Sequence, residues 1–314
     1  MNTPLVLDPS DLMRRVAERV PPALLANVVV IGSIATAWAF RDVSGNDSVA
    51  TKDIDLLLRP SVDAVATAQM LGQELLDAGW EPKFPNGIAP GTAEMADEKL
   101  PALRLTPPGG EDGWFVELLA EPSKDQTERK QWRRFSTPAG TFGLPSFRYM
   151  PVAVHGAEET PVGLRVARPA CMALAHLLEH AVPDRTPISS LPGKPPRFIK
   201  DVGRAIALWW LAGQQSITAG PAWRQAWTNV LSTQYPGHTL DMLISARAGL
   251  AAVADYLREA HQIAVIGVLA PHGTTLDAWR RAYAGLLALI EQAAADPSRA
   301  FAAAQAATKP NELP

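Results

Sequence analysis

Two aspartates separated by one residue are the part of this chain best suited to chemistry. Asp53 and Asp55 flank Ile54 and precede an apolar run at 56–58. Because side chains alternate along a strand, both carboxylates are expected on one face of it. Neighbouring carboxylates repel each other unless a cation lies between them. Mg²⁺ prefers one or two carboxylates with water and substrate phosphate, so the pair predicts a magnesium site.

A Gly-Ser step lies upstream of these acids. Gly32 and Ser33 follow the apolar run at 28–31, which predicts a strand, an exposed tight turn and then a helix over 34–40. The first N–H groups of a helix and its dipole suit a phosphate, so we expect both residues to bind a triphosphate. Ser33 is equally suited to being only the N-cap of the helix.

This order of motifs resembles the polymerase-β-like nucleotidyltransferase superfamily, which has a Gly-Ser turn, a helix and then Asp-x-Asp on the next strand. The family uses a third carboxylate from a later strand, and Glu117 is the match within the apolar segment 114–119. Glutamate stands where aspartate is more usual, but its longer side chain can still ligate a metal. The resemblance implies that Asp53, Asp55 and Glu117 are the catalytic metal ligands. They would hold two Mg²⁺ ions, one for the attacking hydroxyl and one for the pyrophosphate.

The later sequence resembles AbiEii-type and related minimal nucleotidyltransferases of bacterial toxin–antitoxin and defence systems. The segment 163–170 leads into a helix, and a Lys-Asp pair follows at Lys200 and Asp201. By this match, which covers roughly residues 25–215, Lys200 would contact triphosphate oxygens and Asp201 would orient it. The alternative is an exposed helix start with a solvated lysine and a capping aspartate.

His176 stands where these relatives often have a lysine on a helix. Only a protonated histidine would replace that positive charge. His176 and His180 are four residues apart on one helix face, a spacing that can bind zinc. We do not expect zinc, because no third ligand or glutamate-containing signature accompanies the two histidines.

A basic run at 129–135 interleaves four cations with two aromatic residues. Such a segment could bind an RNA backbone and stack bases. It could equally be a solvated helix face whose aromatic residues enter the core, and we favour this second interpretation slightly.

Bulk properties restrict the function classes. The 314 residues are enough for two domains, and the 47% hydrophobic content is ordinary for a globular protein. A net charge of −3 gives no global basic field for nucleic acid, although a local patch stays open. Cys171 is the only cysteine, so no intrachain disulfide can form. Neither a signal-peptide pattern nor a membrane-spanning apolar stretch is found, so we expect a cytoplasmic protein without membrane association.

The pattern of apolar runs predicts an α+β nucleotidyltransferase-like domain with a mixed sheet at 1–165, followed by an α-helical bundle domain at 166–314. The expected strands lie at 28–31, 54–59, 103–106, 115–119, 147–154 and 162–166, and the expected helices at 8–20, 34–40, 61–78 (capped by Ser61), 170–181, 199–212, 223–233, 239–261 and 276–294.

We therefore expect a magnesium-dependent nucleotidyltransferase that transfers NMP from an NTP to a hydroxyl acceptor. The resemblance favours tRNA or protein as the acceptor, and a toxin with an antitoxin partner. A small-molecule enzyme of the antibiotic-modifying kind is the first alternative, and a non-catalytic nucleotide-binding module is the second. An acidic cleft would favour a polycationic small molecule, and a basic groove would favour RNA.

Overall fold

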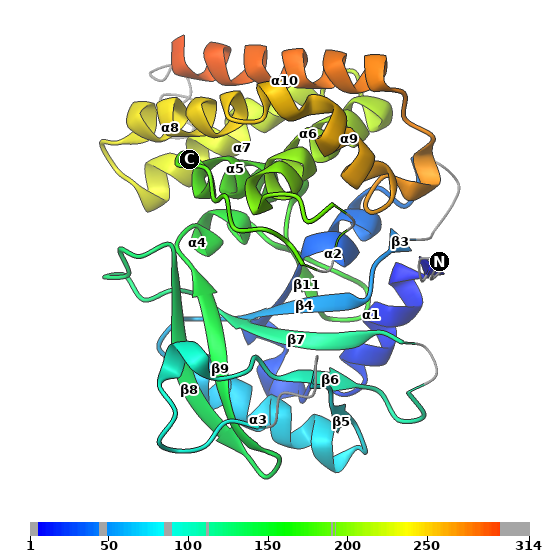
Figure 1. Cartoon of the computed structure of the whole chain (residues 1–314), viewed down its shortest axis with the longest axis vertical. Coiled ribbons are helices and arrows are strands. Elements are labelled where there is room, and N and C mark those ends of the chain that lie inside the picture. The colour runs from blue at the N-terminus through cyan, green and yellow to red at the C-terminus, as the bar shows by residue number, and fades with distance from the viewer. Residues whose placement is uncertain are drawn as a thin grey trace, which may run out of the picture. The chain divides into compact units, whose positions relative to one another are not determined.

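The described part of the chain comprises residues 6–43, 49–84, 90–110, 113–189, 191 and 193–295 of a computed structural model. It forms two units, one of the described residues up to Arg168 with Ile266–Pro271, and one of Pro169–Val265 with the described residues from His272 to Ala295. The first unit combines helices with a mixed sheet, and the regular elements described in the second are helical (Figure 1). The predicted α+β class with a mixed sheet is confirmed.

The larger sheet has nine strands within the described residues. Its main path runs β10 (Glu158–Glu159), β11 (Arg165–Val166), β2 (Val28–Ile31), β4 (Asp53–Leu58), β7 (Phe115–Ala120), β6 (Arg104–Thr106) and β5 (Glu81–Pro82). The long hairpin of β8 (Lys130–Thr137) and β9 (Gly140–Phe147) joins this path where β9 pairs with β7 (Figure 1). A separate small sheet pairs β1 (Val6–Leu7) with β3 (Val49–Ala50).

The sheet is mixed because some neighbouring strands are antiparallel and others are parallel. β2 is antiparallel to β4, β4 is parallel to β7, and β6 is antiparallel to β7. The expected strands at 103–106 and 115–119 are thus confirmed as the antiparallel pair β6 and β7. All four residues of β2 are buried, as expected for a central strand covered on both faces.

The first unit contains four described α-helices, α1 (Pro9–Ala17), α2 (Gly32–Ala39), α3 (Ala64–Asp77) and α4 (Met150–Ala153). The described 3-10 helices of the chain are η1 (Pro22–Asn27), η3 (Asp97–Lys99), η4 (Ala254–Tyr256) and η5 (Ala270–His272).

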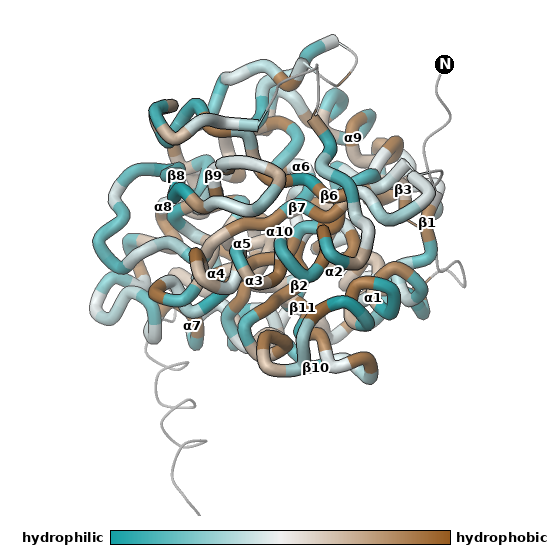
Figure 2. The backbone as a smooth tube through the Cα atoms, turned by 90° about the horizontal axis from the view of Figure 1, so that it is seen from below, coloured by the Kyte–Doolittle hydropathy of each residue, from teal (hydrophilic) through white to brown (hydrophobic). Residues whose placement is uncertain are grey.

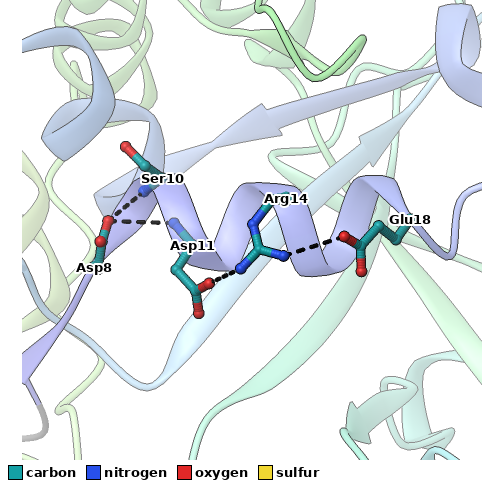
Figure 3. Close-up of polar contacts among 5 residues, drawn as sticks. All are labelled: Asp8, Ser10, Asp11, Arg14 and Glu18. Atoms are coloured by element: carbon teal, nitrogen blue, oxygen red, sulfur yellow. Dashed lines mark hydrogen bonds and ion pairs between the residues drawn. The ribbon is translucent and has the colours of Figure 1, made fainter.

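α1 shows how local sequence sets a helix. Asp8 caps its N-terminus by accepting from the backbone N–H groups of Ser10 (2.8 Å) and Asp11 (3.2 Å). On the exposed face Arg14 lies between Asp11 and Glu18 (Figure 3). The opposite face is buried, and Figure 2 shows both hydrophobic and hydrophilic residues along this helix.

The second unit contains α5 (Pro169–Glu179), α6 (Arg197–Gln215), α7 (Ala219–Gln234), α8 (Thr239–Ala251), α9 (Leu257–Val265) and α10 (Leu276–Ala295). Its core includes Trp227, whose indole N–H donates to the Ala170 carbonyl at 2.7 Å. α8 approaches α5 closely, because a Cβ on Gly249 would lie 2.1 Å from the Leu177 carbonyl oxygen.

The single helix predicted over 239–261 is wrong. The chain instead forms α8, then η4, then α9. The break allows α8 to pack against α5 while α9 packs against α6, where Gly203 and Ala260 approach closely. Tertiary packing has overridden a helical periodicity that continues across the break.

Three further local predictions are wrong. The basic run is the strand β8, paired along its length with β9, and not a helix face. Residues 147–154 do not form one strand, because β9 ends at Phe147 and α4 begins at Met150. Ser61 does not cap α3, which begins at Ala64; its backbone N–H instead donates to Glu121 Oε2 at 3.2 Å. For the basic run and for Ser61, a partner outside the segment decides the local structure.

Because α8 contacts α5 at Gly249, a substitution there tests the helix packing of the second unit. Gly249→Ala should destabilise the protein by about 2 kcal/mol, because the added methyl group meets a backbone carbonyl that moves only with α5. Urea denaturation measures the change. Gly213→Ala in α6 is the matched control, since nothing lies within 4 Å of its Cβ position. It should stabilise by up to about 1 kcal/mol through helix propensity. Equal effects at both sites would contradict the packing.

Candidate functional site

Four residues form a row across one face of the sheet of the first unit. The strand register pairs Ile31 with Asp55, Asp55 with Glu117, and Glu117 with Arg104. Residues paired across neighbouring strands project from the same face. Asp53 precedes Asp55 by two residues and shares that face. The sheet thus places all three predicted acids on one face, with an arginine beyond the third.

The carboxylate of Asp55 lies against the first turn of α2. Gly32 has a φ of +73°, and a Cβ built on it would lie 2.5 Å from Asp55 Oδ2. Any side chain at this position would therefore collide with the carboxylate, in a backbone conformation that favours glycine. The helix dipole also favours a negative charge here. The Gly-Ser step and the second aspartate, separated in sequence, are neighbours in space.

The other two acids have side-chain partners. Asp53 is half-buried, and its Oδ1 accepts from the Thr51 hydroxyl at 2.7 Å. Glu117 Oε2 accepts from Arg104 Nε at 2.6 Å, in a pair whose side chains are 16% and 31% exposed, respectively. Thus the charge of Glu117 is balanced by a guanidinium on the neighbouring strand.

Asp53 and Asp55 alone suit a Mg²⁺ ion better than the set of Asp53, Asp55 and Glu117. Across the described ranges, no three Asp, Glu, His or Cys side chains lie close enough together to hold one ion. Glu117 shares the face of the aspartates, but its carboxylate is turned toward Arg104. A Mg²⁺ ion needs only one or two protein carboxylates beside water and phosphate. Asp53 and Asp55, with the first turn of α2 next to Asp55, are a suitable donor set.

Sequence patterns did not reveal the cations beside these acids. Phe115 pairs in register with Asp53 on β4. Lys83 Nζ lies 4.9 Å from the centroid of the Phe115 ring, and Arg104 Cζ lies 5.2 Å from it. The sequence predicts the strands at 103–106 and 115–119, but it does not say which residues of the two strands face each other.

The Gly-Ser step is not the exposed turn that the sequence predicts. Ser33 is only 7% exposed, and Gly32 is buried too. The step follows a buried strand directly, and α2 packs back onto β4, which leaves little of its first turn exposed. A bulky residue at position 33 would therefore disturb packing as well as any bound phosphate.

The Lys-Asp pair lies in the second unit, on α6. Asp201 is in the second turn of α6, which begins at Arg197, so the aspartate is not a helix cap. Its Oδ2 lies 3.1 Å from Nε2 of the buried His180. Burial raises the pKa of Asp201, but the His180 hydrogen bond and the nearby Lys200 charge outweigh it and hold the pKa below its ordinary value.

His176 is neutral near pH 7. Burial lowers its pKa to about 3, and the positive charges of Arg204 and Lys200 act in the same direction, against Asp201. A neutral imidazole does not supply the positive charge of a lysine. The histidine is therefore no electrostatic replacement for the lysine expected from the resemblance.

Two arginines of the basic run have structural roles. Arg133 donates to the carbonyl oxygens of Ser61 (2.7 Å) and Glu121 (2.9 Å). Arg134 Nε donates to Asp97 Oδ1 at 2.9 Å. Both guanidinium groups tie loops to β8, so they offer little to an RNA backbone.

No family model, curated protein or solved structure matches this chain. Among the described helices, none has both the length and the apolar character needed to cross a membrane. Motif order and the geometry of the carboxylate face are therefore the features of this chain that indicate a function.

The half-buried imidazole of His176 predicts a pH-dependent stability. The unfolded chain binds a proton at His176 below about pH 6.5, whereas the folded chain binds it only near pH 3. Stability should therefore fall as pH falls through this window, by at most about 1.4 kcal/mol per pH unit. His176→Gln should remove up to about 2 kcal/mol of the loss between pH 7 and pH 5.

Urea denaturation at both pH values measures the effect. His238→Gln is the control, because the His238 side chain is 68% exposed. An unchanged pH dependence in His176→Gln would show that the imidazole is not held neutral by burial.

Proposed function

We propose that this chain is a metal-dependent nucleotidyltransferase, which transfers NMP from an NTP to a hydroxyl acceptor and releases pyrophosphate. One observation supports the proposal above the others. The Asp55 carboxylate lies against Gly32 at the start of α2, with Asp53 on the same face of the sheet. Metal-binding oxygens and phosphate-binding N–H groups are thus neighbours, as nucleotidyl transfer requires.

Each part of the site has a definite task. Asp53 and Asp55 would hold Mg²⁺, and by resemblance Glu117 is the third ligand. The bound ion supplies positive charge to the phosphoryl oxygens as negative charge develops on them. Backbone N–H groups at Gly32 and Ser33 would bind phosphate oxygens, helped by the dipole of α2.

The transfer itself needs little more from the protein. The acceptor oxygen attacks the α-phosphorus, and the bond from that phosphorus to the pyrophosphate oxygen breaks. The carboxylate nearest the acceptor hydroxyl takes its proton. Holding the two reactants in line is the main contribution of a rigid sheet face to such a reaction.

The side chains next to the three acids indicate which class of acceptor suits the site. Lys83 and Arg104 lie against the buried Phe115 ring, which places two cations near the carboxylates. Cations suit phosphate groups and disfavour a polycationic antibiotic as acceptor. Together with the resemblance to toxin–antitoxin enzymes, this favours tRNA or protein as the acceptor, and an antitoxin as a partner.

The ion pair between Arg104 and Glu117 favours one alternative. A carboxylate already neutralised by a guanidinium would suit a nucleotide-binding module that transfers nothing. Incubation with Mg²⁺, α-labelled NTPs and either total cellular RNA or total protein separates the two functions. Covalent label on an acceptor supports transfer, whereas bound nucleotide without covalent label supports the module.

Asp55→Asn tests catalysis apart from folding. The change is nearly isosteric and relieves carboxylate repulsion, so the melting temperature without metal should stay equal or rise slightly. Labelling of the acceptor should fall by about 10²–10³-fold, because the ion would lose a ligand that also orients it. Melting curves and label transfer are measured on the same preparations.

Asp63→Asn is the control for Asp55→Asn, since Asp63 is an exposed acid just before α3. It should keep both the melting temperature and the activity. Full activity in Asp55→Asn would remove Asp53 and Asp55 from the catalytic centre. Joint loss of folding and activity would make Asp55 a structural acid.

A further inference from the structure

We propose that Arg104 is a positioning residue that holds Glu117 in the metal-free protein and competes with divalent cations for its carboxylate. The inference rests on the proposed function, because it concerns the third metal ligand of that site. It assigns a role to a residue that the sequence motifs do not include.

The geometry of the row supports this role. Glu117 lies between Asp55 on β4 and Arg104 on β6, paired in register with both. Its Oε2 is 2.6 Å from Arg104 Nε, a short charge-assisted hydrogen bond. Glu117 therefore lies between two possible partners. One is an arginine on β6, and the other would be a metal ion held by the aspartate on β4.

Charge explains why the arginine is needed when no metal is bound. Three carboxylates on one face repel each other, and a nearby cation reduces that cost. A guanidinium provides a permanent positive charge for this purpose. The guanidinium of Arg104 also lies 5.2 Å from the Phe115 ring, which keeps it beside the row.

Metal binding and the ion pair should therefore oppose each other. An ion at Asp53 and Asp55 draws Glu117 toward β4 and away from Arg104. By thermodynamic linkage, an interaction that the metal weakens also weakens metal binding by the same factor. Removing the guanidinium should thus strengthen metal binding. An arginine that merely orients Glu117 for the metal would give the opposite sign.

Mn²⁺ titration of the full chain, followed by the EPR signal of the free ion, tests the sign directly. Arg104→Gln should bind Mn²⁺ about tenfold more tightly than the parent protein. The metal-induced rise in melting temperature should also be larger in the variant. Arg104→Met, which keeps an apolar stem against Phe115, is the second variant if glutamine disturbs the fold.

Arg59→Gln is the matched control. Arg59 forms an ion pair with Glu121 at 3.5 Å, just past the far ends of β4 and β7, and removing it should leave Mn²⁺ affinity unchanged. In a Glu117→Gln background, Arg104→Gln should give little gain, because the contested carboxylate is gone.

Unchanged or weaker Mn²⁺ binding in both Arg104 variants overturns the inference, while binding by the parent protein leaves the proposed function standing. A full gain that persists with Glu117→Gln also overturns it, because the effect would then not pass through Glu117. No Mn²⁺ binding by the parent and both variants overturns the inference and the metal-dependent function together.

Discussion

The register of β4 between β2 and β7 is the constraint on which the candidate site depends. It pairs Asp55 with Ile31 and with Glu117. A slip of one residue would turn Asp53 and Asp55 to the other face. It would also expose Ile54 and Leu56, which are fully buried, at a cost of about 2 kcal/mol for each side chain. The apolar residues on one face thus hold the acids in place on the other.

The same register determines which groups offset the negative charge of the acids. The sheet gathers negative charge, and two features of the first unit offset it. The start of α2 lies against Asp55, and Arg104 binds Glu117. In the second unit, Asp201 forms a hydrogen bond with His180, and the lowered pKa of His176 keeps its imidazole uncharged. Each unit thus places a partner next to the half-buried carboxylates Glu117 and Asp201, as a low dielectric demands.

Much of the local structure could be predicted from sequence. The apolar run before Gly32 is a buried strand, the Asp-x-Asp segment is β4, and the helical periods after Arg168 are helices. The errors have one cause. The basic run became β8 because β9 pairs with it, and the helix at 239–261 broke because its halves pack on different helices. α5 and α6 lie outside any window of residues around 239–261, and the residues of β8 do not by themselves show that the next segment pairs with them.

The sequence by itself determined which residues could do chemistry and their alternation along each strand, because a period of two follows from backbone geometry alone. It therefore predicted that Asp53 and Asp55 share a face. Only the tertiary structure decided that Gly32 touches Asp55, that Glu117 faces Arg104, and that Ser33 is buried. Strand order and register are set by packing across the whole sheet, which no short segment contains.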